Sequence, residues 1–175
     1  MSMIEHEPPL SEYINAAEQL NRATFCERFD APVLISTAAD LSELGEAFQT
    51  AKTNSLVTID PAELDVPRPA DLAPVITLKP SFPDKDEVLI GRKEENDLVL
   101  NHESVSGFHA SVHHVAGNRY ALQDRGSTNG TRLNGTSIEP ERKVGLREGD
   151  VLTLGSCSFL FYTPGGLYDM LKEGP

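Results

Sequence analysis

From residue 75 onward the chain is a series of short apolar segments separated by residues that favour tight turns. Asn129-Gly130 and Asn134-Gly135 are two such turn pairs, and Asn-Gly readily adopts the positive φ that short hairpins require. Many short strands at regular spacing are typical of a β-sandwich or barrel. The pattern predicts a mainly β fold with strands at 75–79, 87–90, 98–100, 110–115, 119–123, 131–133, 151–154 and 158–162.

Residues 1–59 follow a different pattern, in which apolar residues recur at helical spacing. One helix is predicted from an N-cap at Ser11 to about Thr24, and a second from residue 37 to residue 51. Short strands are predicted at 31–35 and 55–59. About sixty residues make a marginal core by themselves. We therefore expect a small α/β N-terminal extension that packs on the second half of the chain or on a partner.

Residues 60–74 contain four prolines and four acidic residues. Because proline fixes φ and lacks an N–H donor, regular helix and central strand are unfavourable there. This stretch is predicted to be an extended linker. It separates the N-terminal extension, 1–59, from a β domain at 75–163, which is followed by a C-terminal tail with a short helix at 164–175.

The chain of 175 residues carries a net charge of −12. Such a chain should repel nucleic acid and anionic membranes as a whole, so neither is an expected partner. The N-terminus has no apolar signal segment, and Cys26 and Cys157 are far apart in the sequence, which favours free thiols in a reducing compartment. We expect a cytoplasmic protein in which any anion site is a local exception.

Three loops of the predicted β domain combine arginine, hydroxyl and amide side chains with glycine, at 91–93, 101–109 and 124–131. Arginine presents a planar fork of donors that can pair with two phosphate oxygens. Hydroxyl groups and exposed backbone N–H groups can complete such an anion site. The composition also fits ordinary turn residues, so the order and spacing of the motifs decide between the two interpretations.

Those motifs occur in a definite order along the chain. They are Leu89-Ile90-Gly91-Arg92, Asn96-Asp97-Leu98-Val99-Leu100, Val105-Ser106 followed by His109-Ala110, Asp124 followed by Ser127-Thr128-Asn129-Gly130-Thr131, Leu133-Asn134-Gly135, and Gly149-Asp150. In order and spacing this set resembles the forkhead-associated (FHA) domain, over about residues 75–163. The resemblance implies a β-sandwich of about eleven strands whose loops at one end bind phosphothreonine peptides.

The resemblance implies a role for four residues in binding. Arg92 would grip the phosphate, and Ser106 would bond to it as well. Thr128 would help to shape the phosphate pocket, and Asn129 would hold the peptide backbone. A phosphothreonine carries about −1.5 to −2 charges and three acceptor oxygens, which suits one arginine and a few hydroxyl or amide donors.

Three further motif residues are implied to be structural: Gly91, His109 and Gly130. Gly91 would let the chain turn, and His109 would tie down the loop that presents Ser106. Contacts to the residues that flank the phosphothreonine are expected from a second group, in which the cations equally fit solvated loop charges. This group consists of Lys93, Ser104, Gly107, Arg125 and Arg132.

Two of these positions depart from the family pattern. Gly107 stands where the family often has arginine, asparagine or lysine, so a contact is lost and the loop gains freedom. Ser104 stands where some members carry a cation that selects the third residue after phosphothreonine. A preference for an acidic residue there is therefore not implied.

Other chemistries find little support in the sequence. His109 and His113 lack a cysteine or carboxylate cluster that would complete a metal site. Ser106 and His109 lack the orienting acid and the nucleophile elbow of a hydrolase. No nucleotide-binding fingerprint is present. We expect a protein that is not an enzyme and that needs no cofactor.

These observations predict a phosphothreonine-peptide-binding adaptor in Ser/Thr kinase signalling, with a phosphothreonine-containing protein such as a kinase or its substrate as partner. The alternative is a phosphate-independent protein–protein scaffold built on an FHA-like sandwich, because Gly107 weakens the site. A variant of the first reading is self-regulation, in which phosphorylated Thr37 occupies the pocket within one chain or across a dimer. The oligomeric state is left open.

Overall fold

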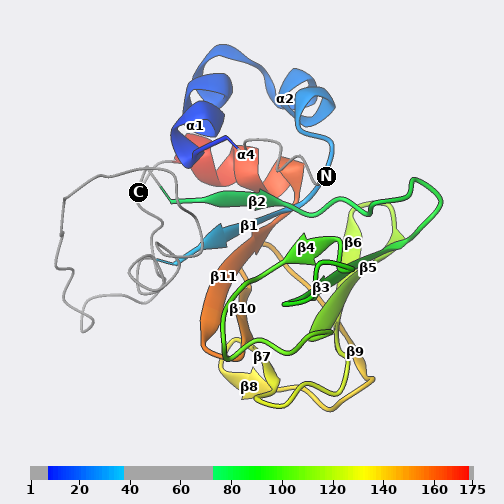
Figure 1. Cartoon of the computed structure of the whole chain (residues 1–175). Coiled ribbons are helices and arrows are strands. Elements are labelled where there is room, and N and C mark those ends of the chain that lie inside the picture. The colour runs from blue at the N-terminus through cyan, green and yellow to red at the C-terminus, as the bar shows by residue number, and fades with distance from the viewer. Residues whose placement is uncertain (1–7, 38–72, 174–175) are drawn as a thin grey trace, which may run out of the picture.

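The computed structural model describes residues 8–37 and 73–173, which form eleven strands in two sheets and three helices (Figure 1). The six-stranded sheet has the order β2-β1-β11-β10-β7-β8, and the five-stranded sheet has the order β4-β3-β5-β6-β9. The bounds are α1 Leu10–Gln19, α2 Arg22–Arg28, β1 Val33–Ser36, β2 Val75–Thr77, β3 Glu87–Gly91, β4 Leu98–Val99, β5 Ala110–Ala116, β6 Arg119–Asp124, β7 Thr131–Leu133, β8 Thr136–Ser137, β9 Lys143–Gly145, β10 Val151–Leu154, β11 Cys157–Tyr162 and α4 Pro164–Glu173. The predicted mainly β sandwich is confirmed.

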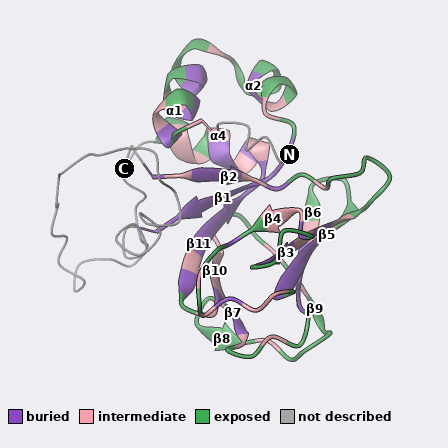
Figure 2. Cartoon of the chain, viewed as in Figure 1, coloured by how far each residue is buried: buried purple, intermediate pink, exposed green. Residues whose placement is uncertain are grey.

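The main core lies between the inner faces of the two sheets, where Figure 2 shows the buried segments of the strands. Because side chains on a strand alternate between its two faces, every second residue enters this core. On β3, for example, Val88 and Ile90 are buried while Leu89 is only partly covered. Phe159 and Phe161 of β11 fill the centre and are at most 1% exposed. Burial of each such side chain contributes about 1.5–3 kcal/mol.

Strand β1 lies inside the six-stranded sheet, between β2 and β11, and pairs antiparallel with both. All four of its residues are buried. Leu34 belongs to the core between the sheets, whereas Val33 and Ile35 belong to a second core on the other face. The strand predicted at 31–35 is therefore present. It makes the segment 8–37 part of the six-stranded sheet.

Helices α1, α2 and α4 pack together against the outer face of the six-stranded sheet and cover this second core (Figure 1). Phe25 of α2 is fully buried there, and its ring contacts those of Phe29 and Tyr168. Arg22 of α2 makes two hydrogen bonds to Asp169 of α4, at 2.9 and 3.0 Å. Residues from both ends of the described chain thus form one helical layer, which makes the molecule three layers thick.

The single helix predicted from Ser11 to about Thr24 is wrong in two respects. Its N-cap is Pro9 instead of Ser11, so the helix begins two residues earlier, at Leu10, which is buried under the first turn. It also ends at Gln19, and a new helix starts after Asn21. The Asn21 side chain accepts the backbone N–H of Thr24 at 3.0 Å, which is a typical N-cap contact and starts the second helix. Leu20, which precedes it, has an extended backbone that ends the first helix.

The eight strands predicted after residue 75 are all present, with ends shifted by a few residues. Strands β8 and β9 were not predicted, since they are short and lack apolar alternation. The C-terminal helix is present and spans Pro164–Glu173. The helix predicted at 37–51, the strand predicted at 55–59 and most of the linker predicted at 60–74 lie outside the described residues. Within the described ranges, no helix is long and apolar enough to cross a membrane.

Candidate functional site

Backbone and side-chain hydrogen bonds bring together the three loops that the sequence singled out. The N–H groups of Arg92 and Lys93 donate to the carbonyl oxygens of Ser106 and Gly107, at 2.9 and 3.2 Å. The N–H of Thr128 donates to Oγ of Ser106 at 2.9 Å. The β3–β4, β4–β5 and β6–β7 loops therefore meet around Ser106.

Gly91 permits the close approach of the first two loops. A Cβ atom at this position would lie 2.3 Å from the carbonyl oxygen of Gly107 and 2.9 Å from Nδ2 of Asn96. Real Cβ atoms do not come so close to a backbone oxygen, so only glycine fits without a shift of the loop. Gly91 was predicted to let the chain turn. In the structure its lack of a Cβ atom instead allows the two loops to pack closely.

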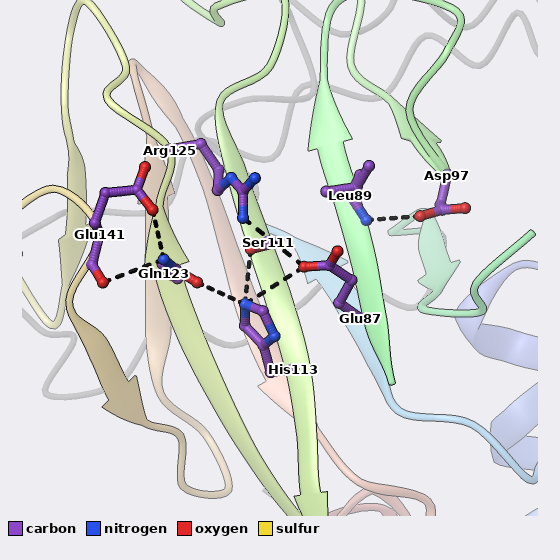
Figure 3. A network of polar contacts seen from close by, with 8 residues as sticks. All are labelled: Glu87, Leu89, Asp97, Ser111, His113, Gln123, Arg125 and Glu141. Carbon is purple, nitrogen blue, oxygen red and sulfur yellow. Dashed lines mark hydrogen bonds and ion pairs between the residues drawn. The ribbon is translucent and has the colours of Figure 1, made fainter. Parts of the chain in front are cut away.

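Asn96 and Asp97, whose roles the sequence motifs do not predict, hold the loop that carries Arg92. Nδ2 of Asn96 donates to the carbonyl oxygens of Lys93 and Gly107, both at 2.7 Å. The carboxylate of Asp97 accepts the N–H of Leu89 on β3 at 2.8 Å (Figure 3). Asn and Asp side chains often form hydrogen bonds to the backbone of nearby loop residues. Their presence between β3 and β4 is the sequence signal that could have indicated this role.

His109 connects the second loop with the third. It is fully buried. Its Nδ1 accepts the N–H of Ser106 at 2.9 Å, and its Nε2 lies 3.1 Å from the carbonyl oxygen of Gly130. Since a carbonyl oxygen only accepts, Nε2 carries the proton and the ring is neutral. Burial lowers the pKa of His109 below its ordinary value, although the bond to Gly130 and the charge of Asp124 oppose this.

Asp124, at the end of β6, organises the third loop. Its carboxylate accepts the N–H groups of Gly126 and Ser127 and the hydroxyl groups of Ser127 and Thr131. Burial by itself raises the pKa of Asp124, but these hydrogen bonds outweigh burial and leave the pKa below its ordinary value. A buried carboxylate with four donors fixes the turn that presents Thr128.

The four residues expected to bind a phosphopeptide lie on the surface of these joined loops. Arg92, Thr128 and Asn129 are exposed, and Ser106 is half-buried. Within the described part of the chain, the guanidinium of Arg92 has no hydrogen-bond or ion-pair partner. Nδ2 of Asn129 donates to the carbonyl oxygen of Ser104 at 2.8 Å, so the amide oxygen of Asn129 is left to accept from outside the loop.

Among the expected flank contacts, Lys93 and Gly107 lie beside Ser106, and Ser104 lies next to the β10–β11 turn. Oγ of Ser104 accepts the N–H of Ser156 at 2.9 Å and lies 2.8 Å from Nδ1 of His102. The hydroxyl of Ser104 is thus engaged in holding two loops together. This arrangement fits a structural contact better than a free side chain that awaits a peptide.

The structure directs the side chains of Arg125 and Arg132 to the outer faces of the two sheets. Nη1 of Arg125 lies 3.9 Å from a carboxylate oxygen of Glu87 on β3 (Figure 3). Arg132, in the middle of β7, pairs with Thr153 of β10 and Ser137 of β8. Neighbouring Thr131 is buried, so Arg132 points to the outer face by strand alternation.

Arg125 is the end of a polar network that crosses the outer face of the five-stranded sheet (Figure 3). Nε2 of His113 lies 2.7 Å from Oε1 of Gln123 and 2.9 Å from Oγ of Ser111. Burial is the first reason that the pKa of His113 lies below its ordinary value, and the charge of Lys143 adds to it. His113 thus belongs to a network on the outer face of the sheet, whereas His109 joins two loops.

Thr37, the residue considered for self-regulation, is buried at the end of β1. It is 7% exposed, and its hydroxyl donates to the carbonyl oxygen of Ser158 at 3.4 Å. A kinase needs an accessible hydroxyl. As folded, the chain does not offer the Thr37 hydroxyl for phosphorylation.

Comparison with known proteins identifies the region that contains these loops. Residues 88–155 match the family model described as the FHA domain. An FHA domain-containing protein of Arabidopsis thaliana is 38% identical over 60 residues, which cover 34% of this chain and 15% of the relative. Human kanadaptin is 37% identical over 95 residues, which cover 49% of this chain and 13% of kanadaptin. The chain thus matches only a small part of either relative.

Among solved structures, the MEK1 FHA domain in complex with a phosphothreonine peptide of HOP1 is similar, with 27% identity and a TM-score of 0.43. The match covers 51% of this chain and 87% of the solved chain.

Proposed function

We propose that this chain, which carries an FHA domain over residues 88–155, binds phosphothreonine peptides through the joined loops around Ser106. FHA domains belong to the modules that read phosphorylated motifs with arginine clusters. The chain would act as an adaptor in Ser/Thr kinase signalling, with a phosphothreonine-containing protein as partner and no catalysis of its own.

The observation that carries this proposal is the state of Arg92. The chain has 27 acidic residues against 15 basic ones, so carboxylate partners are abundant. The backbone of Arg92 is nevertheless held against the Ser106 loop, while its guanidinium has no partner in the described ranges. A fixed backbone with an unpaired, exposed guanidinium is what a receptor for an external anion requires.

Ser106 and Thr128 supply the remaining donors in this proposal. Oγ of Ser106 already accepts the N–H of Thr128, so its hydroxyl proton is left to donate to a phosphate oxygen. The hydroxyl of Thr128 is exposed on the same loop. Charge-assisted hydrogen bonds contribute about 1.5–3 kcal/mol each. Three of them can supply most of a micromolar affinity, which corresponds to about −8 kcal/mol.

Asn129 would hold the peptide backbone. Its Nδ2 is tied to the carbonyl oxygen of Ser104, which fixes the orientation of the amide. The amide oxygen then faces away from that bond and can accept an N–H from the bound peptide. Fixing the side chain beforehand reduces the entropy lost on binding.

The test is a binding titration of the full chain against a degenerate phosphothreonine peptide library, with phosphoserine and unphosphorylated libraries in parallel. We expect micromolar binding to the phosphothreonine library alone. Arg92→Ala and Ser106→Ala should abolish it. Arg119→Ala is the matched control, because Arg119 is an exposed arginine at the opposite end of β6, and it should bind as the wild type does.

Three results would overturn the proposal. Binding retained in both Arg92→Ala and Ser106→Ala would place the pocket elsewhere. Equal binding to phosphorylated and unphosphorylated peptides, or no binding to any library, would favour a phosphate-independent scaffold.

A further inference from the structure

Lys93 lies across Gly107, the residue next to Ser106. Carbons Cγ, Cδ and Cε of Lys93 are 3.1–3.2 Å from the position that a Cβ atom of residue 107 would take. The N–H of Lys93 donates to the carbonyl oxygen of Gly107 at 3.2 Å. The lysine side chain thus occupies the space that a side chain at position 107 would use.

The ammonium group of Lys93 has no strong partner. Its Nζ lies 5.0 Å from the centre of the Phe108 ring, which is 46% exposed. In the described part of the chain Lys93 makes no ion pair, although Glu94 and Glu95 follow it directly. An exposed cation over an aromatic ring is a weak contact, so the ammonium can move to a better acceptor at little cost.

We propose that Lys93 is a second phosphate-binding cation, which delivers its charge across Gly107 to the phosphothreonine gripped by Arg92. This inference rests on the proposed phosphopeptide function. On binding, Nζ leaves the Phe108 ring and donates to a phosphate oxygen. The exchange is favourable because a charge-assisted hydrogen bond to a dianion is stronger than an exposed cation–π contact.

Gly107 and Lys93 are therefore coupled in function. Gly107 has no side chain to reach the phosphate, and its lack of a Cβ atom is what leaves room for the stem of Lys93. A lysine introduced at position 107 would displace that stem and could deliver a charge from the same place. A lysine at position 107 should therefore replace the function of a lysine at position 93. If Lys93 only stabilised the loop through Phe108, a lysine at position 107 would not replace it.

The experiment measures fluorescence anisotropy of the full chain with a phosphothreonine library whose degenerate positions contain only uncharged residues. Lys93→Ala should weaken binding about tenfold, as expected for loss of one charge-assisted contact. Adding Gly107→Lys to Lys93→Ala should recover most of the affinity. The slope of log affinity against log salt should decrease in Lys93→Ala and return in the double variant.

Lys85→Ala is the matched control. Nζ of Lys85 lies 5.1 Å from the centre of the Phe82 ring, so this variant removes a similar contact from the loop before β3. It should leave affinity unchanged.

The outcomes separate the two proposals. Wild-type binding that Arg92→Ala abolishes but Lys93→Ala changes by less than twofold would overturn only the role of Lys93. An effect of Lys93→Ala seen solely with libraries that contain acidic residues would also overturn it, because Lys93 would then contact a flanking carboxylate. Absence of wild-type binding would overturn both proposals.

Discussion

The imidazole ring of His109 bridges Ser106 and Gly130, with Nδ1 2.9 Å from the N–H nitrogen of Ser106 and Nε2 3.1 Å from the carbonyl oxygen of Gly130. Both bonds are inaccessible to water because the ring is fully buried. His109 is therefore the buried link between the two loops that carry Ser106 and Thr128, beneath the exposed bonds Thr128–Ser106 and Asn129–Ser104.

His109→Ala should lower the free energy of unfolding by about 1–3 kcal/mol, because a buried backbone donor and acceptor lose their partners. It should also weaken phosphopeptide binding, since Ser106 is no longer held in place. Chemical denaturation and the library titration measure the two effects. His114→Ala is the control, because His114 is exposed on the same sheet. Equal unfolding midpoints for the two variants would contradict the bridging role.

Stability should fall as the pH drops below about 6.5, the ordinary pKa of histidine. The pKa of His109 is lowered in the folded protein, so the unfolded chain binds a proton first and acid favours unfolding. The stability contributed by the neutral ring is complete above pH 6.5 and is lost as the pH falls through the folded pKa. Denaturation at pH 7.5 and 5.5, for wild type and His109→Gln, isolates this contribution. A wild type with the same pH dependence as the variant would refute it.

Gly91→Ala should destabilise the chain by about 1–3 kcal/mol, as expected for forcing an atom into a packed contact. The new Cβ would meet the backbone oxygen of Gly107 at 2.3 Å, and a backbone atom cannot turn aside as a flexible side chain can. Gly145→Ala is the matched control, because a Cβ there meets nothing within 4 Å. Thermal melting compares them. If both alanine variants melted together, the close packing at Gly91 would not be required.

Ser36→Ala should leave stability unchanged or raise it by up to about 1 kcal/mol. In the described residues, Oγ of Ser36 is buried without a hydrogen-bond partner, and an unsatisfied buried hydroxyl costs free energy. Ser111→Ala provides the contrast, because that equally buried hydroxyl bonds to His113 and its loss should destabilise. Guanidinium unfolding of both variants tests the difference in sign. A destabilised Ser36→Ala would show that its hydroxyl has a partner in the folded chain.

The strands that could be predicted are those whose side chains line the core. At 87–90 and 151–154 the requirement to bury alternate residues leaves a visible pattern. Strands β8 and β9 leave none. The turn at Asn134-Gly135, with φ of 51° and 79°, brings Thr136 of β8 back along β7 regardless of apolar content. Strand β9 is three residues long and is fixed by its pairing with β6. The break between α1 and α2 lies at Leu20 and Asn21, whose backbones are extended. The capping contact of Asn21 is a small local signal within an otherwise continuous helical pattern.

The assembly of the loops around Ser106 was also accessible from the sequence, because the resemblance to the FHA domain implied that the loops with Arg92, Ser106 and Thr128 lie at one end of the sandwich. The directions in which the nearby arginine side chains point could not be predicted from the sequence. Arg125 follows buried Asp124 and so turns to Glu87 on the sheet face, which depends on tertiary packing. The binding roles of these residues stay predictions until a peptide is titrated.

The position of β1 has a practical consequence for anyone who prepares the β domain alone. A fragment that starts at residue 75 would lack an interior strand, so among the described strands β2 would lose its one neighbour and β11 one of its two. The vacant slot would expose unpaired backbone groups together with the apolar surfaces that Leu34 and Ile35 cover on opposite faces. Such open edges recruit strands from other molecules. The segment 8–37 therefore has to accompany the domain, on the same chain or as an added peptide, to keep that fragment from aggregating.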